Sequence, residues 1–350
     1  MKTLFLICGL LSGNAVAAID AVPHPETKFD SSETVLWSPL FQAAWDSTFK
    51  SFGPVIATEP PNPLANRLSS FKWDAAKVMP DGAWKTWTGQ ATAEFLDKVN
   101  AEAAKMTGEA NGPFRLDQEN HSQIATFGLL DREVTFRKKM QPCLTAPLIF
   151  KTEATTHPVR YFGLQTEADA DAIRVISYNG KTRSHAIQLR CQEANDTVIL
   201  YLPPQPQDFA TACLWIRTWT SQADQIIDED FFNAPSLHEG DEIRVPYLEL
   251  ESTKNFADSL DCWLRFKNRA PYKMVRAEQR TRFKLHEAGA SVRSEASLVA
   301  APFSSPPAPP YPRKFIYDRP FFVFLWREGS AWPYFGAWVG NADGMLPFEK

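Results

Sequence analysis

The sequence predicts an α+β fold, because its helical and strand-like segments occupy different parts of the chain. Apolar residues recur at helical spacing in two segments before residue 110, whereas alternating or continuous apolar segments dominate from Ile124 onward. There is no internal repeat and no regular alternation of strands with helices, which a doubly wound parallel sheet would require. The 350 residues, of which 44% are hydrophobic, suffice for one large domain with a substantial core.

The two helices predicted before residue 110 have an amphipathic pattern. In "ETVLWSPLFQAAWDSTFKSFG" a short apolar strand meets the corner Ser38-Pro39, and helical spacing begins at Phe41. A proline-rich loop follows, and the apolar positions of "AEFLDKVNAEAAKM" then share one helical face. We therefore expect a strand, a tight corner and a buried helix, with a second helix further along the chain.

The later segments predict strands of two kinds. "REVTFRKKM" and "DEIRVPYLELES" alternate, as strands with one buried face do, and "TVILYLPP" is an apolar strand ended by Pro203. The next segment, "NFADSLDCWL", has a helical pattern. Near the end, "FFVFLWREGSAWPYFGAWVG" predicts two strands, the first apolar over residues 321–326 and therefore buried on both faces.

The first residues have the form of a secretory signal. One lysine precedes a short apolar run, and small residues follow, so we expect cleavage near Ala17 or Ala18. Residues 1–18 would then be removed, and residues 19–350 would form a single domain that is secreted, extracellular or periplasmic, and monomeric. The formal net charge of −4, with acids and bases interspersed, predicts neither nucleic-acid nor membrane binding by the mature chain.

Export makes disulfides possible for the cysteines of the mature chain. Four remain after removal of the signal: Cys143, Cys191, Cys213 and Cys262. Four cysteines allow three pairings, among which the sequence does not choose, and a chain of this size can also keep all of them as free thiols. No CxxC or Cys/His spacing predicts a metal site.

No common catalytic signature is present. The patterns GxSxG, HExxH, GxGxxG and the P-loop are missing, and the six histidines are scattered, so surface or structural roles explain them better than catalysis. "HEGDEI" concentrates carboxylates at residues 238–243, and a solvated turn before a strand explains it better than a metal site. We therefore predict a protein that is not an enzyme, without catalytic residues, cofactor or metal.

One region changes its composition abruptly. Proline is missing over residues 272–301, and six prolines then fall among the eleven residues from Pro302 to Pro312. Residues 281–286 alternate as a half-buried strand, and after Gly289 small residues continue to alternate with polar ones. A segment that enters the middle of a sheet must exclude proline, because each proline removes a ladder hydrogen bond. An unstructured Ala/Ser linker is the alternative on composition.

On these residues the chain resembles a serpin. "EAGASVRSEAS" at 287–297 is similar to the hinge of that family's reactive loop, "SSPP" at 304–307 to the segment after the cleaved bond, and "FIYDRPFFVFLW" to the strand that follows. "PYFGAWVGN" looks like the family's last strand, "VLWSPL" resembles its Phe-Ser-Pro corner, and "IRVPYLELES" its Leu-Pro strand. The matches follow the family's order over most of the mature chain.

The resemblance implies three β-sheets with surrounding helices and an exposed reactive centre loop at about residues 287–316. It also implies a mechanism. A serine protease cleaves the loop, becomes esterified to the residue before the cut, and is trapped when the loop enters the central sheet as a new strand. The positions that match the hinge are Glu287, Gly289, Ala290, Val292, Ser294 and Ala296.

The family's spacing from the hinge glycine puts the reactive bond between Phe303 and Ser304. Ala300, Ala301 and Pro302 would then contact the protease subsites. A large aromatic residue before the bond suits a chymotrypsin-like protease, and subtilisin-like proteases also accept one.

Some positions depart from the family pattern. Arg293 and Glu295 stand where efficient inhibitors have alanines, and Tyr247 replaces the lysine that usually pairs with the hinge glutamate. Phe41 and Gln279 replace a serine and a histidine that latch the central sheet in many inhibitory members. A non-inhibitory binding or interaction protein with the serpin fold therefore stays open as an alternative, as do, more remotely, an exported enzyme and an unrelated α+β binding protein.

Overall fold

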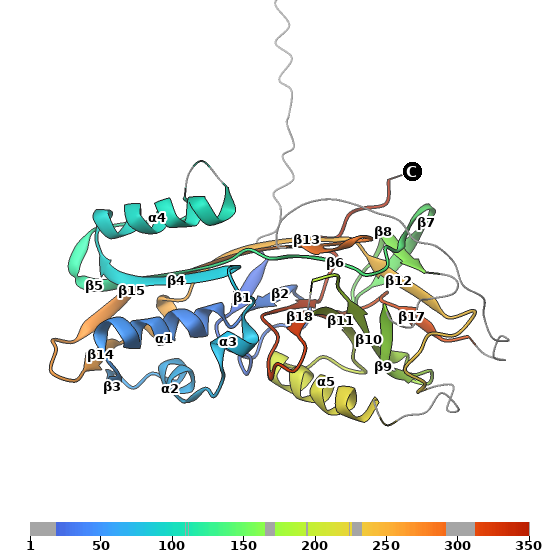
Figure 1. Ribbon diagram of the computed structural model, residues 1–350, viewed down its shortest axis with the longest axis horizontal. Coiled ribbons are helices and arrows are strands. Elements are labelled where there is room, and N and C mark those ends of the chain that lie inside the picture. Colours follow the sequence, from blue (N-terminus) through green and yellow to red (C-terminus); the bar gives the residue numbers. More distant parts are fainter. Residues whose placement is uncertain are drawn as a thin grey trace, which may run out of the picture.

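The computed structural model describes residues 19–108, 110, 112–164, 172–193, 195–223, 225, 233–291 and 312–349. Three β-sheets of seven, four and eight strands form its framework. Figure 1 shows helix α4 on one face of the largest sheet and helix α1 on the other, with α5 against the seven-stranded sheet. The prediction of an α+β fold with three sheets and surrounding helices is confirmed.

The seven-stranded sheet joins the two ends of the chain. Its strands in spatial order are β1 (Asp20–Val22), β2 (Val35–Trp37), β19 (Phe335–Val339), β18 (Phe321–Arg327), β11 (Asp196–Leu202), β10 (Ser184–Arg190) and β9 (Ile173–Asn179). As predicted, β18 is buried from Phe321 to Trp326. One face packs on helix α5 (Phe209–Ala223) through an aromatic-rich cluster, and the other faces the main core.

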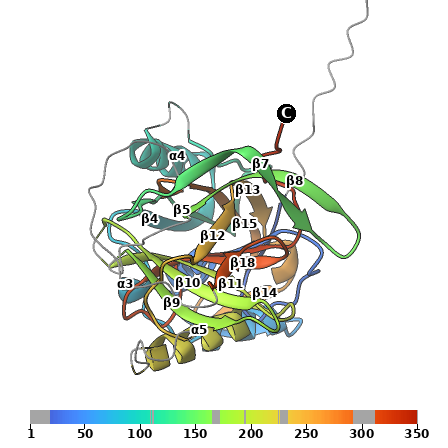
Figure 2. The same cartoon turned by 90° about the vertical axis from the view of Figure 1, so that its right-hand side faces the viewer.

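The eight-stranded sheet is the central one. It contains β3 (Val55–Glu59), β14 (Trp263–Phe266), β15 (Tyr272–His286), β16 (Gly289–Ser291), β6 (Glu133–Thr135), β13 (Leu248–Asn255), β5 (Asn120–Leu130) and β4 (Trp84–Ala91). The four-stranded sheet has the order β17 (Lys314–Ile316), β12 (Glu242–Pro246), β8 (Thr156–Leu164) and β7 (Gln141–Lys151). Figure 2 shows the β7–β8 hairpin arching over one end of the molecule.

The two helices predicted before residue 110 form where the sequence places them. Helix α1 (Leu40–Phe52) begins after the predicted corner, where the Ser38 hydroxyl donates to Tyr334 O and accepts from Leu40 N. Helix α4 (Ala93–Thr107) begins with Thr92 as N-cap and ends at Gly108, whose left-handed conformation is typical of a C-terminal cap. The shorter helices are α2 (Pro63–Ser70), α3 (Ala75–Val78) and the 3₁₀ turn η1 (Asp258–Leu260).

One local prediction is wrong, and one helix has no predicted counterpart. The helix expected over 255–264 is only the turn η1 followed by β14, because Trp263 and Leu264 pair with Glu59 and Thr58 of the distant strand β3. Helix α5 has no predicted counterpart, because it lies in a part of the chain that otherwise forms strands. None of the helices in the described ranges is long and apolar enough to cross a membrane.

The four cysteines do not pair. Cys191, Cys213 and Cys262 are buried free thiols, and Cys143 is a half-buried one. The structure therefore corresponds to the free-thiol alternative, and burial raises the pKa of the Cys191, Cys213 and Cys262 thiols.

Candidate loop hinge and sheet seam

The segment predicted as the hinge begins as a strand in the middle of the central sheet. On one side β16 pairs antiparallel with β15, with Ala290 opposite Leu285. On the other side β16 pairs antiparallel with β6, with Ala290 opposite Val134. Backbone hydrogen bonds on both edges therefore hold residues 289–291 between two strands.

Small side chains are required at this position. A Cβ atom on Gly289 would lie 2.2 Å from Val134 O, which is closer than any real contact. Ala290 is completely buried and faces the same core as its partners Leu285 and Val134. The neighbouring strands and the core therefore leave little room for side chains at Gly289 and Ala290.

The turn into β16 is fixed by both backbone and side-chain contacts. Met140 N donates to Glu287 O and Phe136 N donates to Ala288 O, each at 2.8 Å. The Tyr247 hydroxyl donates to Glu287 Oε2 at 2.8 Å. Tyr247 thus takes the partner role that the sequence assigns to it in place of the family's lysine.

The electrostatics of this turn favour a charged Glu287. Burial alone would raise its pKa, but a backbone N–H, the Tyr247 hydroxyl and the nearby Lys139 outweigh burial and lower the pKa below the ordinary value. Lys139 Nζ lies 3.8 Å from Glu287 Oε1. Burial, together with the contact to the Glu287 carboxylate, raises the pKa of Tyr247, so its hydroxyl stays a donor.

His286 also contributes to the turn. Its Nδ1 atom accepts a hydrogen bond from Ala288 N at 3.2 Å, which requires the neutral ring. Burial lowers the pKa of His286, and Glu287 partly opposes this while Lys139 and Lys284 reinforce it. The neutral form is therefore favoured in the folded protein near neutral pH.

Beyond β16, strand β15 pairs directly with β5, the strand that precedes β6 in the chain. β15 pairs parallel with β5 from Lys273 opposite Gln123 to Gln279 opposite Gly128. We call this junction the seam. β15 therefore changes its neighbour from β5 to β16 between Gln279 and Lys284.

The seam lacks the latch that many serpins carry. Phe41 packs against Phe256, with ring centroids 4.7 Å apart. The Gln279 amide donates to Thr281 on its own strand at 3.2 Å. Both side chains are buried at the positions that the resemblance assigns to a serine and a histidine.

The far end of the loop is held by a buried ion pair that the sequence did not reveal. The Arg313 guanidinium donates to Asp241 Oδ2 at 2.7 Å, to Ala234 O at 2.9 Å and to Ser236 O at 2.5 Å. Arg313 N also donates to Asp241 Oδ1 at 2.7 Å. Both side chains have at most 1% of their surface exposed. The exposed turn predicted from "HEGDEI" forms at residues 239–240, just before β12, but Asp241 itself is buried and anchors the start of β17.

The predicted site residues divide into two groups. Glu287, Gly289 and Ala290 lie together at the turn into β16. The others lie outside the described residues: Val292, Ser294, Ala296, Ala300, Ala301, Pro302, Phe303 and Ser304. In the described part of the chain, no group of three or more His, Cys, Asp or Glu side chains is arranged to hold a metal ion.

Comparison with solved structures identifies the fold. Human glycosylated kallistatin superposes with a TM-score of 0.54 at 12% identity, over 89% of this chain and 92% of that one. Mouse protein Z-dependent protease inhibitor gives 0.53 at 13% identity, over 88% and 91%. Human thyroxine-binding globulin, in complex with thyroxine, gives 0.52 at 13% identity, over 89% and 92%.

These superpositions cover nearly the whole of each chain, and the chain has the serpin fold. No family model matches the sequence, and no curated protein sequence matches it. At this identity the likeness concerns the fold, and the function follows from the site and not from the neighbours.

Proposed function

We propose that the chain is a secreted inhibitor of serine proteases that acts through cleavage of its reactive loop and insertion of the loop into the central sheet. The observation that carries the proposal is β16, whose residues already form a strand between β15 and β6. A loop with its first residues in the sheet needs no new nucleation to continue inward, because each further residue extends an existing ladder.

The register supports this route. Continuing β16 for five residues puts Ala296 opposite both Gln279 and Gly128, which now pair with each other. The same register puts Val292, Ser294 and Ala296 on the buried face with Ala290, while Arg293 and Glu295 fall on the other face. Small side chains thus fall where the core would receive them.

The energy of insertion is large enough to drive the process. About a dozen new backbone hydrogen bonds, each with a net value of ~0.5–1.5 kcal/mol, give on the order of 10 kcal/mol. This equals the stability of many whole domains, roughly 5–15 kcal/mol. The intact protein would therefore be metastable relative to its cleaved form.

The proposed reactive bond joins Phe303 and Ser304, and the proposed target is a chymotrypsin-like or subtilisin-like protease. Incubation with chymotrypsin and with subtilisin should give a complex that survives SDS, with a fragment that ends at Phe303 by mass spectrometry. Phe303→Ala should reduce the complex with chymotrypsin strongly.

Ala290→Arg tests the insertion step separately from the cleavage step. A buried charge at this position disrupts β16, the strand from which insertion would continue, whereas the distant bond stays cleavable. The variant should be cut as readily as the wild type but should release active protease. Full trapping by Ala290→Arg would contradict the proposed route.

A non-inhibitory binding protein is the second candidate, favoured by Arg293 and Glu295 in the hinge and by the likeness to thyroxine-binding globulin. This candidate predicts clean cleavage near Phe303 without a trapped complex and without a gain in thermal stability.

A further inference from the structure

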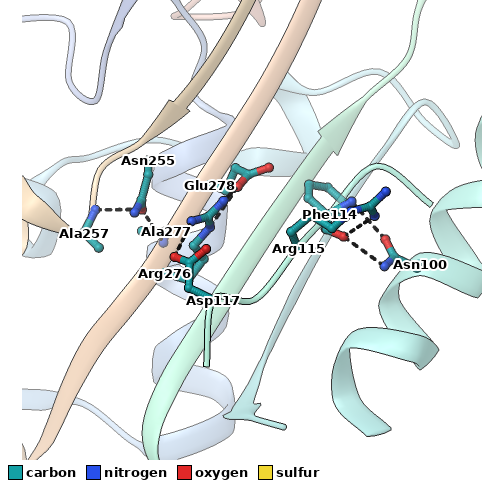
Figure 3. A network of polar contacts seen from close by, with 9 residues as sticks. All are labelled: Asn100, Phe114, Arg115, Asp117, Asn255, Ala257, Arg276, Ala277 and Glu278. Atoms are coloured by element: carbon teal, nitrogen blue, oxygen red, sulfur yellow. Dashed lines mark hydrogen bonds and ion pairs between the residues drawn. The ribbon is translucent and has the colours of Figure 1, made fainter. Parts of the chain in front are cut away.

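A chain of polar contacts crosses the closed seam (Figure 3). On β15, Arg276 Nη1 donates to Asp117 Oδ2 at 2.9 Å, and Asp117 lies in the connection that leads from α4 to β5. The same guanidinium donates through Nε to Glu278 on its own strand at 2.8 Å. Asp117 and Arg276 therefore lie on opposite sides of the junction that an inserting strand must open.

The connection that carries Asp117 is tied to α4. The Asn100 side chain donates to Phe114 O at 3.1 Å and accepts from Phe114 N at 3.0 Å. The buried Phe114 ring packs against Trp87 of β4 and Phe127 of β5, with centroids 6.1 and 4.9 Å apart. Asp117 is thus held with α4, β4 and β5, and it cannot simply follow β15 when that strand moves.

Helix α4 is itself bound to the same side of the seam. Glu102 accepts from Trp87 Nε1 at 2.7 Å and pairs with Lys85 Nζ at 2.7 Å, and both partners belong to β4. Val99 and Ala103 are completely buried on the sheet. The body on one side of the seam therefore comprises α4, β4 and β5, and β15 belongs to the other side with β13 and β14.

An inserted strand separates these two bodies. Neighbouring strands lie about 4.8 Å apart, so one new strand moves β15 away from β5 by roughly that distance. A 2.9 Å contact between Asp117 and Arg276 does not survive such a movement while Asp117 stays with α4. We propose that the Asp117–Arg276 ion pair is a clasp that restrains the opening of the seam and so regulates how efficiently the loop inserts. This inference rests on the proposed function.

The clasp acts late in insertion. Arg276 is opposite Ala125, three pairs beyond Gln279 and Gly128, where displacement of the existing ladder would begin. The first part of the seam can therefore open while the clasp holds, and the clasp breaks only when the strand reaches its level. Because 79% of the Asp117 side-chain surface is exposed, its contribution is modest, about two- to fivefold in rate.

Asp117→Asn tests the clasp without removing either member of the neighbouring Arg276–Glu278 pair. Faster insertion leaves less time for the trapped ester to hydrolyse, so the ratio of released to trapped subtilisin should fall about two- to fivefold relative to the wild type. Asp117→Glu should restore the wild-type ratio.

Asp261→Asn is a matched control. Asp261 pairs with Lys273 of β15 at 2.6 Å and has 72% of its side-chain surface exposed, so it resembles Asp117 in strength and exposure. It precedes β14, however, and lies on the same side of the seam as β15. Asp261→Asn should leave the ratio of released to trapped subtilisin unchanged. Before cleavage, both variants should melt at the same temperature as the wild type.

Two outcomes separate the clasp from the proposed function. If the wild type traps subtilisin and Asp117→Asn gives the same ratio as Asp261→Asn, the clasp is refuted and the proposed function stands. If the wild type is cleaved without trapping and without a gain in stability, the proposed function fails, and the clasp fails with it.

Discussion

The two ends of the segment that joins β16 to β17 are held in opposite ways. At the β16 end, Gly289 and Ala290 lie in the sheet through backbone pairing, and the turn before them is fixed by partly exposed contacts of Glu287. At the β17 end, Arg313 is completely buried and donates to Asp241 and two backbone carbonyls. The fold thus permits extension at one end and fixes the other, as the proposed cleavage and insertion of the loop require.

Removing the buried ion pair at the β17 end should cause the largest loss of stability. Arg313→Ala leaves Asp241 as a buried charge without its cation, which costs about 3–5 kcal/mol. The free energy of unfolding in urea should fall by that amount. Arg265→Ala, which removes a surface ion pair with Glu59, should cost less than about 1 kcal/mol. Equal losses in the two variants would contradict the anchor.

The stability of the fold around the β17 end should also decrease in acid. His185 is buried against Phe315 and Tyr317, and burial, with Arg319 and Arg183 nearby, lowers its pKa from 6.5 to about 3. The unfolded chain binds a proton that the folded chain excludes, so this contribution is complete above pH 6.5 and is lost as pH falls toward about 3.

The measurement is the free energy of unfolding against pH for the wild type and His185→Gln. Over this window the wild type should lose about 1.4 kcal/mol per pH unit more than the variant. Parallel curves would mean that His185 titrates normally in the fold.

At the β16 end, Gly289→Ala should disturb the hinge. Its Cβ would meet Val134 O at 2.2 Å, and relief of such a clash costs about 1–3 kcal/mol. Amide exchange in β16 and β6 should accelerate, and trapping should fall. Gly180→Ala, whose new Cβ would meet Tyr178 at 3.5 Å, is the control and should leave both unchanged. Slow exchange in Gly289→Ala would show that the strand tolerates a side chain there.

The smallest effect is expected at the turn. Tyr247→Phe removes the hydrogen bond to Glu287, which should cost about 0.5–1.5 kcal/mol. Because that bond helps to lower the pKa of Glu287, the variant should raise the pKa of Glu287 toward its ordinary value in an NMR titration. An unchanged titration would place Tyr247 outside the electrostatics of the hinge.

Local pattern predicted much of the fold. Strands β2, β18 and β19 and helices α1 and α4 form where spacing and caps indicate them, because their signals lie within a few residues. Strands β3 and β14 could not be predicted locally, because they pair with each other across about 200 residues of chain. Helix α5 is not predicted, because the segments before and after it have strand-like patterns.

The site could be predicted only in part. Glu287, Gly289 and Ala290 emerged from the resemblance, and the structure brings Tyr247 to Glu287 as that resemblance implies. The Arg313–Asp241 pair could not be found from sequence, because two charged residues 72 positions apart give no signal that they are buried together. The contact between Asp117 and Arg276 at the seam could not be predicted for the same reason, because the two residues lie far apart in the sequence.

The thermal midpoint of the chain before and after cleavage of the loop by subtilisin tests the central claim most directly. Insertion worth on the order of 10 kcal/mol predicts a rise of about 10 °C or more in the cleaved protein. A cleaved protein that melts at the temperature of the intact one would contradict the account.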